Sequence, residues 1–440
     1  MPLQYFPTGR SASEIAADVE TAVRDGRLPP GAALPPVRAL ATELRVSPAT
    51  VASAYRDLRV KGIARGHRRA GTRITGSPPT APRPPLAVPA GVRNLLSGSP
   101  DPLLLPPLPG LWRSAGAAAS PRLYGHSPVS PRLAAVASVR LEADRIDTAN
   151  LAVVSGALDG VERILATALR PGDRVAVEDP GYAPLLDLLA AMDLETEPMS
   201  VDESGVRPEA LAAAIVAGCR AAVFVPRAQS PTGAAWDGER AYDLADVLAN
   251  APDLLIIEDD HAGEVAGSAA ISIASGRPRW AVIRSVSKSL GPDLRMAVVA
   301  GDAVTISRVE GRQALGAGWV SYLLQDTVAG LWQDPAVAEL LGRAAAAYAN
   351  RRQMLITALA SLGIPARGKS GLAVWVPVAD EAGTTSALLE RGWAVAPGER
   401  FRIASPPGIR IGVATLTAAE IEQLAGDLYA SLRQRPRRSD

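Results

Sequence analysis

Hydrophobic positions near the start of the chain recur with helical spacing and predict three short helices. The helices are expected over residues 11–24, over residues 37–44 and over the segment "VSPATVASAYRDL". In the third segment Ser47 suits the cap and Pro48 the first helical position. The expected inward-facing residues of the first and third helices are Ile15, Val19, Val23, Val51, Tyr55 and Leu58.

A basic hairpin is expected after the third helix, because "IARGHRRAGTRI" is typical of two short strands around a turn. Three helices and a hairpin make either a winged helix-turn-helix or a small interaction domain with a solvated basic face. In the first case, small residues let the third helix enter the major groove, and arginines contact phosphates. The candidate DNA-binding residues are Arg38, Ser47, Ala49, Thr50, Ser53, His67, Arg68, Arg69, Thr72 and Arg73.

From about residue 150, strand-like runs alternate with helical stretches, as in "LAVV" before "SGALDGVERILATAL". This alternation predicts an α/β fold with a mainly parallel sheet covered by helices. A helical stretch, the strand-like "GLAVWVPV" and "IRIGVATL", and a terminal helix predict a smaller second α/β domain. We therefore expect a multidomain chain. Its parts are a winged helix-turn-helix (α+β) over 1–75, a proline-rich linker over 76–92 and a body over 93–440, whose large part spans about 120–335 and small part about 336–440.

Charge divides the chain in the same way. Residues 1–83 carry 13 basic and 6 acidic side chains, whereas the rest carries 33 and 39. A basic front on an acidic body suggests a nucleic-acid module joined to something else, although charges also cluster by chance. A single cysteine, Cys219, fits a reducing cytosol. Three histidines and one cysteine argue against a zinc site, and the absence of a long apolar run indicates no membrane span. We therefore expect a cytoplasmic protein.

Lysine is rare in this chain, which makes Lys288 noteworthy. Among 46 basic side chains only Lys61, Lys288 and Lys369 are lysines, so arginine serves wherever a plain positive charge suffices. Lysine alone of the two can lose its proton and act as a nucleophile toward aldehydes. Lys288 follows the strand-like "WAVIRSV", and α/β proteins place ligands at the carboxyl ends of strands. Otherwise it is an ordinary loop lysine.

Other segments add weaker signals. "SGAL" at residues 155–158 joins a strand to a helix and is either a phosphate seat or an ordinary turn. The acids of "IIEDDH" either pair with a cationic ring nitrogen or form caps and surface ion pairs. Arg295 suits a phosphate dianion. Arg410 either binds a carboxylate in bidentate fashion or is a charge on an edge strand.

The order of these segments carries a resemblance. "LPPVR", "SPATVASAYRDL" and "GTR" resemble the winged helix-turn-helix of GntR-type bacterial regulators. "SGALDG", "EDPGY", "QSPTG", "EDDH", "SVSKSLGPDLR" and "IRIG" resemble, in the same order, the fold-type I aminotransferases, which use pyridoxal 5′-phosphate (PLP). The combination covers nearly the whole chain and resembles the MocR class of regulators.

The resemblance implies a role for each matching residue. Lys288 is expected to form a Schiff base with PLP, and Asp259 to pair with the pyridine nitrogen, so that the ring acts as an electron sink. The expected effector is an amino acid or an amine, and Arg410 is expected to bind the carboxylate of an amino-acid-like ligand. The other implied cofactor-binding residues are Gly156, Ala157, Ser285, Ser287 and Arg295 at the phosphate, Tyr182 against the ring, Ser230 and His261 near the ring hydroxyl, and Tyr124, which reaches a neighbouring subunit's cofactor in a homodimer.

Some positions depart from the two families. Ser230 replaces the usual Asn, and His261 replaces a Tyr, so both partners of the ring hydroxyl are altered. In the front domain, Pro48 and Ala52 replace residues that are often basic, so specificity is expected to lean on dimer spacing or DNA shape.

We expect a PLP-responsive regulator of vitamin B6 or amine metabolism genes, whose partners are an operator DNA and a second copy of the chain. The alternatives are an active aminotransferase with a secondary DNA-binding domain, and a GntR-like repressor whose body has lost PLP.

Overall fold

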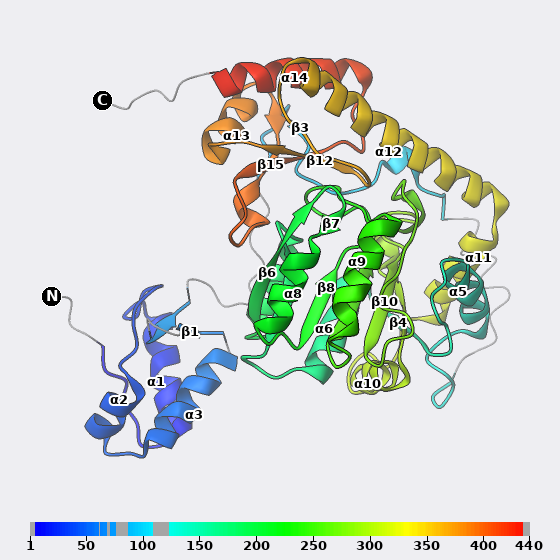
Figure 1. The fold of residues 1–440 in the computed structure, drawn as a ribbon. Helices are drawn as coiled ribbons and strands as arrows, with labels where there is room; N and C mark the ends of the chain where they lie inside the picture. Colours follow the sequence, from blue (N-terminus) through cyan, green and yellow to red (C-terminus); the bar gives the residue numbers. More distant parts are fainter. Residues whose placement is uncertain (1–4, 61, 68–70, 76–86, 109–122, 434–440) are drawn as a thin grey trace. The chain divides into compact units, whose positions relative to one another are not determined.

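The structure is a computed structural model that describes residues 5–60, 62–67, 71–75, 87–108 and 123–433 (Figure 1). The chain divides into two compact units. The first contains residues 1–85 with 170–173 and 184–195, and the second contains 86–169, 174–183 and 196–440. Most of the predicted linker, residues 76–86, lies outside the described residues. Within the described residues, no helix is long and apolar enough to cross a membrane.

The amino-terminal part is the predicted three-helix domain with a hairpin. Its elements are α1 (Ala12–Arg24), α2 (Val37–Leu44), α3 (Pro48–Val60), β1 (Ala64–His67) and β2 (Gly71–Ile74). Ser47 caps α3, since its Oγ accepts a hydrogen bond from the N–H of Thr50 at 3.1 Å. β1 and β2 pair antiparallel, with Ala64 opposite Ile74. The buried core joins all three helices through Ile15, Val19, Leu40, Val51, Tyr55 and Leu58.

An eight-stranded mixed sheet forms the centre of the second unit. In spatial order its strands are β4 (Leu151–Val154), β11 (Ala297–Gly301), β10 (Trp280–Ser285), β9 (Leu255–Asp260), β8 (Ala221–Phe224), β5 (Arg174–Asp179), β6 (Glu195–Asp202) and β7 (Gly205–Val206). Strands β5, β8, β9 and β10 are parallel, as the alternating pattern predicts. Strand β11 runs antiparallel to both of its neighbours. The predicted α/β class is confirmed.

Helices cover both faces of this sheet, so most of its side chains are buried. One face packs with α5 (Pro131–Ala143), α8 (Pro208–Val216), α9 (Gly238–Ala249) and α11 (Tyr322–Gln333) in a single core. On the other face, α6 (Ala157–Ala168) approaches closely enough that Gly160 lies against Val154 and Ile283. Helix α10 (Ala303–Ala314) packs beside α6 (Figure 1). The 3-10 turns Pro102–Leu104, Gly263–Val265 and Pro292–Leu294 also belong to the second unit, whereas α7 (Ala183–Ala191) lies, except for its first residue, in the first.

The carboxyl-terminal part has its own small sheets and core. The long α12 (Pro335–Ser361) leads into it, followed by α13 (Glu381–Glu390) and α14 (Ala418–Arg433). Its three-stranded sheet has the order β12 (Ala373–Pro377), β15 (Gly408–Gly412) and β14 (Ala396–Pro397). A second, two-stranded sheet pairs β13 (Trp393–Ala394) with β3 (Arg93–Asn94), a strand from three hundred residues earlier. A further 3-10 turn spans Gly398–Arg400.

Candidate functional site

The carboxyl ends of the parallel strands bring the predicted site residues to one edge of the large sheet. Asp259 is the last but one residue of β9, and Lys288 lies three residues beyond the end of β10. Ala297, the first residue of the antiparallel β11, pairs with Ser285 on one side and with Val154 on the other. The register therefore places Arg295, two residues earlier, between the turn after β4 and the turn after β10.

A phosphate seat is recognisable at the start of α6. Gly156 caps this helix with a φ of 102°, a backbone conformation that favours glycine. A Cβ at this position would lie 2.9 Å from Arg295 Nη2, and the same Nη2 donates to the carbonyl of Ser155 at 3.2 Å. The N–H of Ser287 donates to Ser285 Oγ at 3.3 Å. The helix amino end, with Ala157 in its first position, and the guanidinium together suit a dianionic phosphate.

The amine of Lys288 loses its proton more readily than that of an ordinary lysine. Burial, and then the positive charges of Arg410 and Arg295, lower the pKa of Lys288 to about 8, while the charge of Asp259 acts in the opposite direction. About a tenth of the amine is therefore unprotonated and nucleophilic at pH 7, far more than for a lysine with the ordinary pKa of about 10.4. This environment argues against the interpretation of Lys288 as an ordinary loop lysine.

Asp259 lacks a partner for one of its buried oxygens. Its Oδ1 makes no hydrogen bond within the described part of the chain. Burial, and secondarily the negative charge of Asp260, raise the pKa of Asp259 to about 7. Asp260 itself is held by two buried guanidinium groups, Arg227 at 2.8 Å and Arg284 at 2.5 Å. The Oδ1 of Asp259 is therefore available to a ligand. A cationic group of that ligand would lower the pKa of Asp259 back toward its ordinary value.

Arg410 lies on β15, the central strand of its sheet, so it is not an edge-strand charge. It is buried, its Nη1 donates to the carbonyl of Leu96 at 3.0 Å, and its Nε lacks a partner among the described residues. A Cβ at Gly98 would lie 2.6 Å from Arg410 Nη2 and 3.9 Å from Lys288 Nζ. Arg410 and Lys288 therefore share one site. Gly98, which the sequence analysis missed, lines it.

Tyr182 follows the end of β5 and is 37 % exposed. Burial, then the charge of Asp259, raise the pKa of Tyr182, while Arg410 and Arg295 lower it, so the phenol shares the surroundings of these three groups. The preceding Asp179 anchors the segment: its carboxylate accepts the N–H groups of Ile403, Ala404 and Ser405, each at 2.8 Å. This cap fastens the end of β5 to the loop that precedes β15.

Ser230 and His261, the two departures from the aminotransferase pattern, lie on loops that share an anchor. The hydroxyl of the fully buried Ser370 accepts the N–H of Ala228 at 3.1 Å and donates to the carbonyl of Ala266 at 2.7 Å. Ala228 lies two residues before Ser230, and Ala266 five residues after His261. Burial, and next the positive charge of Lys288, lower the pKa of His261 to about 4, so its imidazole is neutral at physiological pH.

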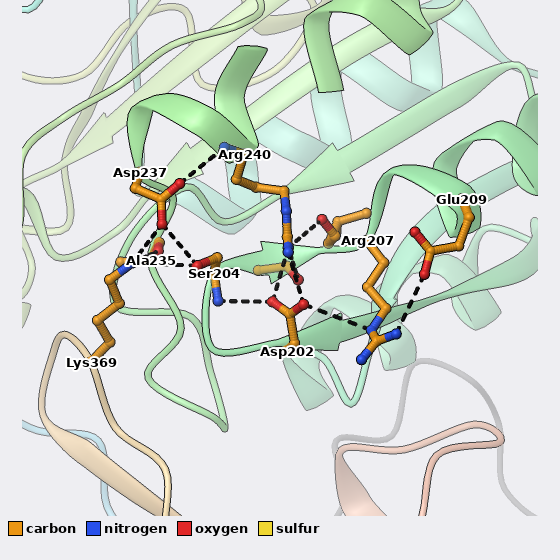
Figure 2. A network of polar contacts seen from close by, with 10 residues as sticks. Asp202, Ser204, Arg207, Glu209, Ala235, Asp237, Arg240 and Lys369 are labelled. Carbon is orange, nitrogen blue, oxygen red and sulfur yellow. Dashed lines mark hydrogen bonds and ion pairs between the residues drawn. The ribbon is translucent and has the colours of Figure 1, made fainter. Parts of the chain in front are cut away.

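The loop that contains Ser370 is itself held from both sides. From within, Arg352 donates to three of its carbonyls, those of Gly368, Lys369 and Gly371, at 2.7, 3.1 and 2.6 Å. At the surface, Lys369 Nζ donates to Asp237 Oδ2 and to the carbonyl of Ala235, both at 3.1 Å (Figure 2). We call residues 367–371 the anchoring loop.

Tyr124 does not join this site within the chain. It is 92 % exposed and stacks edge-on against Trp319, with ring centroids 5.6 Å apart. Its implied role toward a neighbouring subunit stays a prediction. Within the described residues, no cluster of histidine, cysteine and carboxylate side chains could hold a metal ion.

The candidate DNA-binding residues lie on α2, in the cap and first turns of α3, and on the hairpin. Arg38, Ser47 and Ala49 are exposed, and Thr50 and Ser53 are half-buried. Thr72 and Arg73 lie on β2, where Arg73 Nη1 donates to the carbonyl of Gly31 at 2.8 Å. His67 ends β1, but its side chain, together with Arg68 and Arg69, lies outside the described residues.

Two families match complementary parts of the chain. Residues 11–74 match the bacterial regulatory proteins of the gntR family, and residues 114–428 match aminotransferase class I and II. A relative of known function matches almost end to end. The vitamin B6 salvage pathway transcriptional repressor PtsJ of Salmonella typhimurium is 39 % identical over 97 % of this chain and 99 % of its own.

This chain belongs to the MocR class of transcription regulators. Its front is a GntR DNA-binding domain, and its body is an aminotransferase-like domain of a family that generally binds PLP. The regulator TauR of Rhodobacter capsulatus is also similar, with 27 % identity over 80 % of each chain. Among solved structures, a kynurenine aminotransferase of Pyrococcus horikoshii covers 78 % of this MocR-class chain and 91 % of its own, with a TM-score of 0.70 and 20 % identity, which supports the fold alone.

The residues of this MocR-class protein fit PLP. The orphaned Oδ1 of Asp259 suits a protonated ring nitrogen, the seat at Gly156 and Arg295 suits the phosphate, and Lys288 suits the aldehyde. Gly156 follows β4, Arg295 precedes β11, Asp259 lies at the end of β9, and Lys288 follows β10, so the three groups meet at a single edge of the sheet.

Proposed function

We propose that this chain is a transcription regulator that binds an operator through its GntR domain and responds to PLP held covalently on Lys288. The observation that carries the proposal is the single site in which Lys288, with its lowered pKa, shares charges with Asp259, Arg295 and Arg410. A pocket that had lost PLP would have no need to keep a nucleophilic lysine among these groups.

Each residue has a defined task in this proposal. Lys288 supplies a neutral amine, Asp259 holds a proton at the ring nitrogen, and Arg295 with the start of α6 holds the phosphate. Tyr182 flanks the ring, and Arg410 binds the carboxylate of an amino-acid-like effector. PLP, when bound, supplies an electron sink. A homodimer would let Tyr124 of one subunit reach the site of the other.

The similarity to PtsJ supports genes of vitamin B6 metabolism as the target. Regulation requires that the ligand binds two arrangements of the protein with different affinities. Ser230 and His261 differ from the usual partners of the ring hydroxyl, which favours a sensing role over efficient transamination. The complete carboxylate site at Arg410 keeps aminotransferase activity as the second candidate.

The first experiment is the visible absorption of the purified protein with added PLP, compared with Lys288→Ala. We expect a new band in the wild type that the variant lacks and that borohydride removes. DNA binding would then be measured with and without PLP on the wild type. An absent lysine-dependent band would refute cofactor attachment, and an operator affinity that PLP leaves unchanged would refute its role as effector.

A further inference from the structure

A cationic pocket lies at the edge of the large sheet opposite to the PLP edge. Its volume is about 470 Å³. Arg220 immediately precedes β8, Arg279 immediately precedes β10, and Arg308 lies on α10. The last turns of α6, with Ile164 and Ala168, form another part of the lining. Every one of these segments lies in the second compact unit.

The three guanidinium groups of this pocket lack acidic partners. Within the described residues, none of Arg220, Arg279 and Arg308 forms an ion pair, and Arg279 uses one nitrogen to donate to the carbonyl of Asp253 at 2.9 Å. The one carboxylate of the lining, Asp302, is engaged elsewhere. It accepts hydrogen bonds from the N–H groups of Trp280, Val304 and Thr305 and from the Thr305 hydroxyl.

The concentration of positive charge runs against the composition of the body. From residue 84 onward the chain carries 33 basic and 39 acidic side chains, so unpaired arginines around one hollow are not a consequence of general basicity. A concave surface with charges of one sign focuses its field and raises the local concentration of oppositely charged ligands. Ile164, Ala168 and Val304 add an apolar wall beside the charges.

We infer that this pocket binds a small anionic ligand, with a carboxylate or phosphate group held by Arg220, Arg279 and Arg308 and a compact apolar portion against α6. Guanidinium forks match both oxyanions in geometry, and the volume lies within the range of small-molecule sites. The inference goes beyond the proposed function and does not depend on PLP binding.

The pocket is connected to the PLP edge by two elements. Helix α6 begins at the phosphate seat of Gly156 and ends at the pocket, and β10 leads from Arg279 to Ser285, three residues before Lys288. A ligand in the pocket therefore contacts the far ends of the same helix and strand that shape the PLP site.

The test is calorimetric titration of the full chain with phenyl phosphate, benzoate and inorganic phosphate. Arg220→Gln combined with Arg308→Gln removes two exposed charges of the pocket. Arg312→Gln, also on α10 but outside the lining, is the matched control. Arg295→Gln identifies binding of the same probes at the PLP edge. The probe that binds best distinguishes a phosphate ester from a carboxylate as the ligand class.

We expect one binding event that weakens at least about tenfold in the double variant and persists in Arg312→Gln and Arg295→Gln, since a charge-assisted hydrogen bond is worth about that factor. The inference would be overturned if each of the three probes bound the double variant with the same affinity as the wild type. So would a double variant that loses affinity for duplex DNA while no probe binds to the wild type, because the arginines would then contact DNA phosphates. Failure of PLP attachment to Lys288 would leave this result unaffected.

Discussion

The guanidinium of Arg295 fills the space into which a side chain at Gly156 would extend, with Nη2 2.9 Å from the position of such a Cβ. These residues are far apart in the sequence, but Gly156 follows β4 and Arg295 precedes β11. Because β4 and β11 pair, the strand register brings the two residues into contact. The first prediction concerns this contact.

Gly156→Ala is expected to weaken PLP binding at least about tenfold, because the methyl group displaces Arg295 and the positive φ strains alanine by about 1 kcal/mol or more. The measurement is a titration of the visible PLP band. Gly276→Ala is the control, since Gly276 has a φ of 83° but no atom within 4 Å of its Cβ position. Equal PLP affinity in the two variants would contradict the predicted seat.

The rate at which PLP attaches to Lys288 should depend on pH through the amine. Burial, Arg410 and Arg295 lower its pKa to about 8. Since only the neutral amine attacks an aldehyde, the rate should rise about tenfold per pH unit below pH 8 and level off above it. Stopped-flow absorbance from pH 6 to pH 10 measures this, with a free alkylamine run in parallel to correct for ionisation of PLP itself. A rate that still climbs at pH 10 would show an ordinary lysine.

Ser370→Ala should loosen both loops that carry the ring-hydroxyl partners. The change leaves the buried N–H of Ala228 and the carbonyl of Ala266 without this hydroxyl, at a cost of about 1–3 kcal/mol in the free energy of unfolding. Hydrogen exchange of residues 228–233 should accelerate in the PLP-free protein. Lys369→Met is the control from the same loop, because its exposed ion pair with Asp237 is worth at most about 1 kcal/mol. Unchanged exchange in Ser370→Ala would argue against the anchoring role.

Arg38→Gln should weaken binding to duplex DNA to a similar extent for all sequences and reduce the slope of log affinity against log salt by about 1, as expected for one lost phosphate contact. Fluorescence anisotropy at several salt concentrations provides the slope. Arg24→Gln, an exposed arginine in the last turn of α1, should leave it unchanged. If both variants behave alike, the effect is general charge and not a contact of Arg38.

Much of this site could be predicted from the sequence, because its residues follow the carboxyl ends of parallel strands. Apolar runs identify β9 and β10, and parallel strands end at the same edge, so Asp259 and Lys288 had to lie near each other. The helices of the front domain were equally clear, since their inward faces repeat with a strict period and Ser47 and Pro48 mark the start of α3.

Other parts depend on pairing that no local pattern encodes. Strand β11 looks like any apolar run, yet its antiparallel direction brings Arg295 to the seat. Gly98 reaches Arg410 because β3 pairs with β13, some three hundred residues later. Ser370 lies in a short polar segment typical of a surface turn, and only the packed structure shows that it is fully buried. A glycine or serine with no flanking motif carries no signal of its own.

The pairing of β3 with β13 places the segment that follows the predicted linker beside Arg410. The chain leaves the predicted linker at residue 92, enters the carboxyl-terminal part at once, and by Leu96 and Gly98 it already touches Arg410. Leu96, four residues after the end of the predicted linker, thus contacts the guanidinium that is expected to bind an effector's carboxylate. If Arg410 binds an effector's carboxylate as proposed, a shift of its guanidinium would act directly on the backbone at Leu96, the carbonyl to which it donates.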